Sequence, residues 1–188
     1  VLHDPQGLIN LMGGNENYTA KMDKIFTSEP TSDYSYYGFK IHEILEMELA
    51  GMGQYAHGNQ PIQHAIYLYN YAQQPWKTQE KVRYVMDNLY GSGADGYCGD
   101  EDNGQTSAWF VFSSLGFYPV APVTGQYILG SPLFEQATIK LANGKELIIN
   151  AHNNIDKNIF INNFAFNKVS SNNNWIDHKN IKEGGVID

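Results

Sequence analysis

The chain has 188 residues, of which 42% are hydrophobic and 17% charged, a balance that excludes a disordered polypeptide and fits one ordinary globular domain. The net charge of −8 argues against nucleic-acid binding, which needs clustered Lys and Arg to displace counterions. No apolar run is long enough to span a bilayer, and the single Cys98 excludes an internal disulfide framework. The chain opens at VLHDPQGL, without a Met or a signal peptide, so we interpret it as an excised piece of a longer protein.

Up to about residue 118, apolar residues recur at helical spacing and predict five helices. A Gly13-Gly14-Asn15 turn precedes the first, Pro61 suits the start of the third, and Gly116 ends the fifth. Their apolar stripes are, in chain order, Tyr18, Met22, Ile25 and Phe26; Ile41, Ile44, Leu45 and Leu49; Ile62, Ile66 and Tyr69; Val82, Val85, Met86 and Leu89; and Trp109, Phe112 and Leu115.

From about residue 126 the apolar period changes to two, which is typical of β-strands. Residues 137–141 and 145–150 predict a hairpin, because Asn143-Gly144 between them is a strong turn signal. Residues 158–169 carry further strand pattern, and residues 170–174 predict a turn. A helical half, residues 1–120, followed by a β half, residues 121–188, indicates an α+β fold.

The segment DGYCGDEDNGQTSAW, residues 95–109, concentrates carboxylates directly before an apolar helix. A calcium loop of the EF-hand type is excluded, because that loop needs Gly and Glu where Gln105 and Val111 stand. Two interpretations remain open on spacing alone. The acids cap the N-terminus of the helix, or Asp100 and Asp102 lie on one side of an extended loop and together activate a water molecule.

Two other polar stretches are candidates for a site, each with a simpler structural explanation. His42-Glu43 is either a pair on a helix surface or part of a binding site. The loop QYAHGNQP, residues 54–61, carries groups that contact hydroxyls or a hard cation. His57 and His64 could bind zinc, but they lack a third ligand and also suit structural roles. The sequence has no GxSxG, P-loop or GxGxxG motif, and a lone Cys98 is a weak candidate for a nucleophile.

Longer strings point to a known family. HGNQPIQH, YLYNYA, PWKTQ, DGYCGDEDNGQTSAW, LGFYPV and LGSPLF closely resemble family 92 glycoside hydrolases, which are bacterial, calcium-dependent exo-acting α-mannosidases, many of them specific for α-1,2 linkages. The family joins an N-terminal β-sandwich to an (α/α)6 helical barrel. The resemblance implies that residues 1–120 are later helices of that barrel and that residues 121–188 are a β-rich C-terminal segment.

The resemblance also implies roles for individual residues. Members are similar to inverting hydrolases, in which an acid protonates the leaving oxygen while a base activates water on the opposite face. Asp100 and Asp102 match the positions of the base. His42 and Glu43 resemble a pair that contacts the leaving-group sugar in α-1,2-selective members. The family's general acid lies upstream of the segment matched by VLHDPQGL, so we expect the 188-residue chain alone to be inactive.

A calcium ion is the implied cofactor, with Asn59, Gln60 and Asp102 as expected ligands; some members carry Glu where Gln60 stands. The expected partners are a mannose-containing glycan and the missing N-terminal part of the same protein, with no nucleic acid and no membrane span. By analogy, the enzyme would be periplasmic, secreted or on the surface of a bacterium. The competing hypothesis is a non-catalytic, calcium-dependent carbohydrate-binding module.

Overall fold

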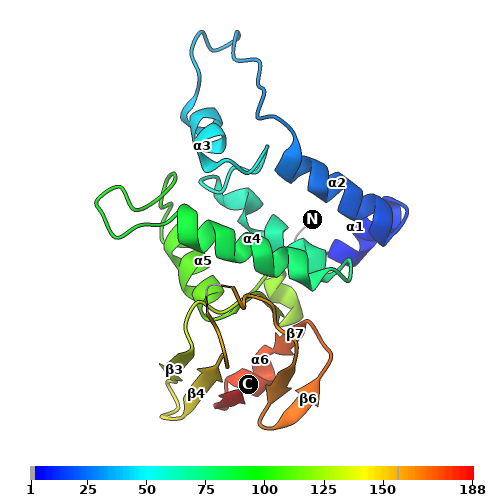
Figure 1. Ribbon diagram of the computed structural model, residues 1–188, viewed down its shortest axis with the longest axis vertical. Coiled ribbons are helices and arrows are strands. Elements are labelled where there is room, and N and C mark those ends of the chain that lie inside the picture. The colour runs from blue at the N-terminus through cyan, green and yellow to red at the C-terminus, as the bar shows by residue number, and fades with distance from the viewer. Residues whose placement is uncertain (1–2, 156) are drawn as a thin grey trace.

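The computed structural model describes residues 3–155 and 157–188, and it has the predicted α+β composition (Figure 1). The predicted helices are all present, although the third is a 3-10 helix, and the sequence pattern missed the helices at Pro5–Leu11, Pro122–Thr124 and His178–Ile181. The helices are α1 (Pro5–Leu11), α2 (Asn15–Thr27), α3 (His42–Ala50), η1 (Gln60–Asn70), α4 (Pro75–Asn88), α5 (Gln105–Ser114), the short η2 (Pro122–Thr124) and α6 (His178–Ile181).

The described residues of the β half form two sheets. The first sheet has the antiparallel order β1-β2-β7, built from β1 (Phe117–Tyr118), β2 (Gln126–Leu129) and β7 (Trp175–Asp177). The second has the order β3-β4-β8-β5-β6, in which β4 and β8 are parallel. Its strands are β3 (Gln136–Lys140), β4 (Glu146–Asn150), β5 (Phe164–Phe166), β6 (Val169–Ser171) and β8 (Gly185–Ile187). The hairpin predicted at Asn143-Gly144 is confirmed by the β3–β4 pairing.

The strand prediction for residues 158–169 is only partly correct. β5 and β6 occupy the second half of this range, and β6 extends over Ser170 and Ser171, where a turn was predicted. In the first half, backbone groups pair with side chains and not with a neighbouring strand. The Ile159 carbonyl accepts from the Ser131 hydroxyl at 2.7 Å, and the Ile161 N–H donates to Gln79 at 3.2 Å. The alternating pattern therefore reflects side-chain packing, with Ile161 against the smaller apolar cluster, and not a strand.

Two apolar clusters form the core. The larger joins η1, α4 and α5 around fully buried Tyr55, Tyr67, Tyr69 and Trp109. The smaller, around Phe117, Leu147 and Ile176, lies between the sheets and α5. The β1–β2 pairing crosses the boundary drawn at residue 120, and that division of the chain stays a prediction.

Helix α3 differs from the other predicted helices because most of its apolar stripe is outside the core. Leu45 is 44% exposed and Leu49 is 86% exposed. Figure 1 shows α3 beyond the packed helices, at the end of the long connection that leaves α2. Among the residues that the structure describes, no helix is both long and apolar enough to cross a lipid bilayer.

Candidate active site

The acidic segment divides its carboxylates between two tasks. Glu101 caps helix α5: its carboxylate accepts from the Gly104 N–H at 2.7 Å and from the Ser107 hydroxyl at 2.6 Å. These hydrogen bonds lower the pKa of Glu101, with the Ser107 bond contributing most. The capping explanation therefore holds for Glu101. In the described part of the chain, no side chain or N–H donates a hydrogen bond to the carboxylate of Asp100 or Asp102, and both residues are exposed.

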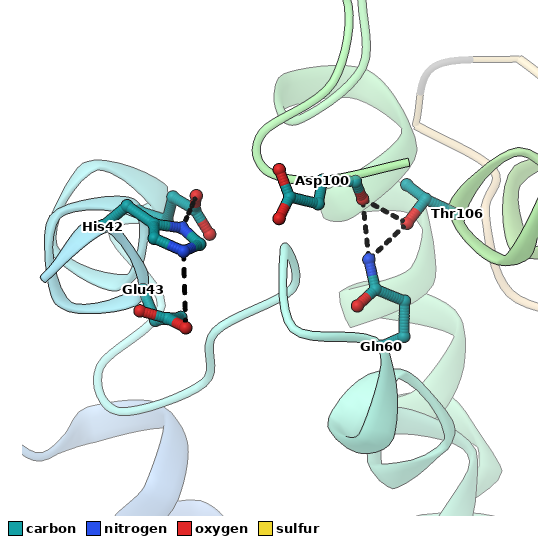
Figure 2. A network of polar contacts seen from close by, with 6 residues as sticks. His42, Glu43, Gln60, Asp100 and Thr106 are labelled. Atoms are coloured by element: carbon teal, nitrogen blue, oxygen red, sulfur yellow. Dashed lines mark hydrogen bonds and ion pairs between the residues drawn. The ribbon is translucent and has the colours of Figure 1, made fainter. Parts of the chain in front are cut away.

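Asp100 is held by its backbone. Its carbonyl accepts from Gln60 Nε2 at 2.6 Å and from the Thr106 hydroxyl at 2.9 Å. Two donors saturate a carbonyl oxygen, so the position of this peptide is fixed while its carboxylate stays free. Figure 2 shows the carbonyl of Asp100 directed to Gln60 and Thr106, and its carboxylate directed to the side where His42 and Glu43 lie. Gln60, Asp100 and Thr106 are called the inner wall below.

The loop around Asp102 is a turn and not the extended segment that the spacing argument assumed. Asp102, Asn103 and Gly104 have φ values of 51°, 57° and 93°, all in the left-handed region. Asp, Asn and Gly tolerate this conformation best, which explains these residue types at these positions. The two-residue spacing alone therefore does not direct both carboxylates to one side.

A buried polar network supports the inner wall from the side of the protein core. The Thr106 hydroxyl accepts from Gln60 Nε2 at 3.1 Å and from Gln63 Nε2 at 3.2 Å. Gln63 also donates to the His57 carbonyl at 3.1 Å, and its backbone carbonyl accepts from Trp109 Nε1 at 3.2 Å. Because Gln63 and Thr106 are fully buried, each of these hydrogen bonds is costly to lose.

His57 belongs to this network as a structural residue. The Tyr90 hydroxyl donates to the Thr106 carbonyl at 3.2 Å, so it accepts from His57 Nε2 at 2.8 Å, and Tyr55 then donates to Nδ1 at 2.7 Å. Both ring nitrogens are occupied and the side chain is fully buried. Burial lowers the pKa of His57 to about 3, so the ring is neutral over the ordinary pH range. Neither nitrogen has a lone pair left for zinc.

Helix α3 faces the inner wall with His42, Glu43 and Glu46, called the outer wall below. His42 Nδ1 lies 2.9 Å from Glu46 Oε1, and Nε2 lies 3.4 Å from Glu43 Oε1 (Figure 2). A carboxylate only accepts, so Nδ1 carries a hydrogen. The hydrogen bond to Glu46 raises the pKa of His42, and the charges of Glu43 and Asp100 act in the same direction. His42-Glu43 is thus a surface pair on a helix that faces Asp100.

The residues expected to bind calcium have suitable chemistry but form an incomplete shell. Calcium takes about 6–8 oxygen ligands. Asn59 and Asp102 are exposed. The amide nitrogen of Gln60 donates to Asp100 and Thr106, so only its Oε1 atom is available to bind an ion. In residues 3–155 and 157–188, no group of three or more His, Cys, Asp or Glu side chains could hold a metal. The side-chain oxygens of these three residues are of the kind that calcium prefers, but three ligands are fewer than a calcium shell takes.

Sequence reasoning missed Thr106 and Glu46, and it placed Gln63 next to the polar loop without indicating its contact with Thr106. Glu46 could have been found, because it stands four residues after His42 on a predicted helix and i, i+4 pairs meet. The other two act through contacts across more than 40 positions in the chain, which no local pattern indicates. For Cys98, burial raises the pKa to about 11, so its thiol stays protonated at neutral pH and is a poor nucleophile.

Comparison with known proteins gives consistent matches over the whole chain. A family model described as the glycosyl hydrolase family 92 catalytic domain matches residues 1–188. A solved family 92 inverting mannosidase from Bacteroides thetaiotaomicron is 53% identical with a TM-score of 0.82; the match covers 100% of this chain and 25% of that one. A family 92 α-mannosidase from the same bacterium, solved with mannoimidazole, is 34% identical with a TM-score of 0.87, over 99% of this chain and 23% of that one.

A curated relative also matches the chain over its whole length. An uncharacterized secreted glycosidase of Arthroderma benhamiae is 27% identical over 191 residues, which cover 100% of this chain and 22% of the relative. The chain therefore spans about a quarter of the length of the proteins that it matches.

Proposed function

The chain belongs to glycosyl hydrolase family 92, and on that basis we propose that it supplies the general-base side of the active site of an exo-acting, inverting α-mannosidase. In this proposal Asp100 and Asp102 activate the attacking water, while a general acid elsewhere in the full-length polypeptide protonates the leaving oxygen. The substrate is a mannose-containing glycan, as suits the inverting mannosidase that is 53% identical.

One observation carries the proposal. Glu101 satisfies the donors at the start of α5, so capping does not account for the neighbouring acids. Asp100 then presents an exposed carboxylate from a peptide that Gln60 and Thr106 hold in place. A fixed backbone with a free carboxylate is what a general base needs, because the proton acceptor must be oriented and not already engaged.

The finer parts of the proposal rest on the family resemblance. The helices would form later parts of an (α/α)6 barrel, with residues 121–188 as its β-rich companion. Calcium, bound in part by Asn59, Gln60 and Asp102, would hold the hydroxyls of the terminal mannose. His42 and Glu43 would contact the leaving-group sugar and favour α-1,2 linkages. An export route to the periplasm, cell surface or medium is supported by the secreted relative.

Asp100→Asn and Asp102→Asn in the full-length polypeptide test the catalytic roles. We expect kcat for mannose release to fall by about 10²–10⁴-fold in each, the usual contribution of a general base. Substrate binding, measured by calorimetry on the inactive variants, should persist. Glu101→Gln is the matched control, because it removes the neighbouring carboxylate that serves as the cap; its kcat should stay within about threefold of wild type. Near-normal kcat in both Asp variants would overturn the assignment.

Two further measurements separate the alternatives. A carbohydrate-binding module would bind mannose-containing glycans without releasing mannose, even as the wild-type full-length polypeptide. The 188-residue chain alone should release none, because the general acid is supplied from elsewhere; robust turnover by this chain would contradict that division.

Calcium is tested by direct binding and by activity. We expect calorimetry to detect one calcium ion in the chelator-treated full-length polypeptide. Asn59→Ala and Gln60→Ala should weaken that binding in parallel with activity. Unchanged calcium affinity in both variants would remove these residues from the shell.

A further inference from the structure

We propose that Glu46 is a positioning residue for the leaving-group side of the site, because it holds His42 and joins helix α3 to the loop that carries Asp100. The inference rests on the proposed function and adds a residue to it. Glu46 itself would touch neither the water nor the scissile bond. It would act through His42 and through Gly58 and Gly99, which lie in the loops that lead to Gln60 and Asp100.

The contact with His42 fixes the orientation of the imidazole ring. Glu46 Oε1 lies 2.9 Å from His42 Nδ1, one helical turn along α3. The Glu46 side chain is 18% exposed and that of His42 is 60% exposed, so the more buried group holds the more exposed one. With Nδ1–H engaged, Nε2 is the nitrogen left to face Glu43 and a bound sugar hydroxyl.

The other oxygen of Glu46 lies where two backbone segments meet. A Cβ atom placed on Gly58 would lie 2.6 Å from Glu46 Oε2, and one placed on Gly99 would lie 2.7 Å from it. The same Cβ on Gly99 would also lie 2.6 Å from the Cα atom of Gly58. Both distances are too short for a side chain. Glycine is required at both positions because the two backbone segments approach closely, since a Cβ on Gly58 would also lie 2.9 Å from the Cys98 carbonyl oxygen, and the Glu46 carboxylate lies against the same junction.

These two glycines precede residues that the proposed function uses. Gly99 comes directly before Asp100, and Gly58 comes directly before Asn59 and Gln60. Contact with Glu46 thus sets the distance between the outer wall and the inner wall. An ordinary i, i+4 pair on an exposed helix contributes only about 0.2–0.5 kcal/mol and has no such consequence. The contact with both glycines distinguishes Glu46 from a pair of that kind.

The C-terminal end of α3 is anchored in the core by buried Ala50, whose carbonyl accepts from the Tyr84 hydroxyl at 3.5 Å, but the end that carries His42 has weaker attachments, which makes the Glu46 contact important there. The N-cap residue of α3, Ile41, provides no side-chain hydrogen bond. Leu45 and Leu49 are exposed, and the Lys40–Glu48 ion pair at 2.9 Å lies at the surface. An exposed ion pair contributes little to positioning, since solvent screens it.

The test compares two substrates on variants of the full-length polypeptide. An α-linked mannose disaccharide has a sugar leaving group that can contact His42, whereas an aryl α-mannoside with an activated phenol leaving group has none. For Glu46→Ala, we expect kcat/KM for the disaccharide to fall by about tenfold or more, because misplacing a contact by about 1 Å can cost about a hundredfold. The aryl mannoside should change by less than about threefold.

Two conservative variants keep the test decisive if Glu46→Ala fails to fold. Glu46→Gln retains an oxygen that accepts from His42 Nδ1, so disaccharide activity should stay within about threefold of wild type. Glu46→Asp keeps the charge but is one methylene shorter, and it should show a selective loss between those of the other two. A merely structural role predicts equal losses on both substrates, and that result would overturn the inference.

His42→Ala separates failure of this inference from failure of the proposed function. A selective loss on the disaccharide in His42→Ala, without one in Glu46→Ala and Glu46→Asp, overturns the role of Glu46 alone. If His42→Ala shows no selective loss, the leaving-group contact itself is overturned and the inference falls with it. Selective losses in both His42→Ala and Glu46→Ala support the full chain of contacts.

Discussion

The inner and outer walls of the candidate site are built by opposite means. Gln60, Asp100 and Thr106 rest on a buried network in which nearly every polar group has a partner. The outer wall, by contrast, stands on α3, whose apolar stripe lies largely outside the core. The inner wall is therefore rigid by construction, whereas the outer wall depends on a few polar contacts that a change of one residue can alter.

This difference suits a division of labour. In the proposed function, chemistry that is common to all substrates needs a fixed carboxylate, and a buried network that engages both donors of Gln60 and the hydroxyl of Thr106 provides one. In the proposed function, recognition of the leaving group varies between glycans, and the His42 end of α3, whose Leu45 and Leu49 are exposed, can vary without disturbing the core. Four predictions, ordered from the largest expected effect to the smallest, test this contrast in the full-length polypeptide.

Thr106→Val should have the largest effect, because the Thr106 hydroxyl joins Gln60 and Asp100 of the inner wall to the buried Gln63. We expect a loss of about 1–3 kcal/mol in the free energy of unfolding, the cost of leaving buried groups unpaired. We also expect kcat to fall about tenfold to a hundredfold through displacement of Asp100. Thr106→Ser retains the hydroxyl and should behave nearly as wild type in chemical denaturation and turnover assays. Equal behaviour of Val and Ser would show that the network does not position Asp100.

His57 makes the inner wall sensitive to acid. Its folded-state pKa of about 3 lies below the ordinary value of 6.5, so the unfolded state takes up a proton first as the pH falls. This group has no effect above pH 6.5, and below it the folded state loses about 1.4 kcal/mol per pH unit until pH 3 is approached. His57→Gln should lose stability less steeply between pH 6 and pH 4 in urea denaturation. Parallel pH profiles would refute the neutral, buried role of His57.

Glu101→Gln should lower thermal stability moderately and leave chemistry almost intact. The neutral amide accepts more weakly from Gly104 N–H and Ser107 than the carboxylate does. The midpoint of thermal unfolding should therefore fall further than in Asp102→Asn, whose carboxylate has no such partners. A fall in kcat well beyond threefold, with the midpoint of thermal unfolding little changed, would mean that Glu101, and not only its neighbours, takes part in the reaction.

Leu49→Gln should have the smallest effect, since the side chain is exposed on α3. We expect a change within about 0.5 kcal/mol in the free energy of unfolding, as for most surface substitutions. Denaturation of wild type and variant under the same conditions measures it. A loss above 1 kcal/mol would show that the apolar stripe of α3 packs against another part of the full-length polypeptide, and the contrast between the walls would then be smaller than the structure suggests.

Local patterns predicted most of the secondary structure, with informative failures. The helical periods found α2, α3, α4 and α5, and the Asn143-Gly144 signal found the β3–β4 hairpin. The helical spacing of apolar residues predicted α3 correctly but not its exposure, because burial depends on which other elements pack against the apolar face of a helix. Residues 158–163 alternate like a strand, yet contacts with Ser131 and Gln79 replace a strand partner.

The sequence by itself determined the α+β class and, through long specific strings, the family. It also singled out Asp100, Asp102, His42 and Glu43; spacing alone left capping and catalysis equally supported in the acidic segment, and the family strings favoured catalysis. Only the tertiary structure assigned the cap to Glu101 and connected Asp100 to Gln60, and His42 to Gly58 and Gly99 through Glu46. The physical reason is range: periodicity and turn chemistry act between neighbouring residues, whereas hydrogen-bond saturation and close backbone approach depend on residues that folding brings together.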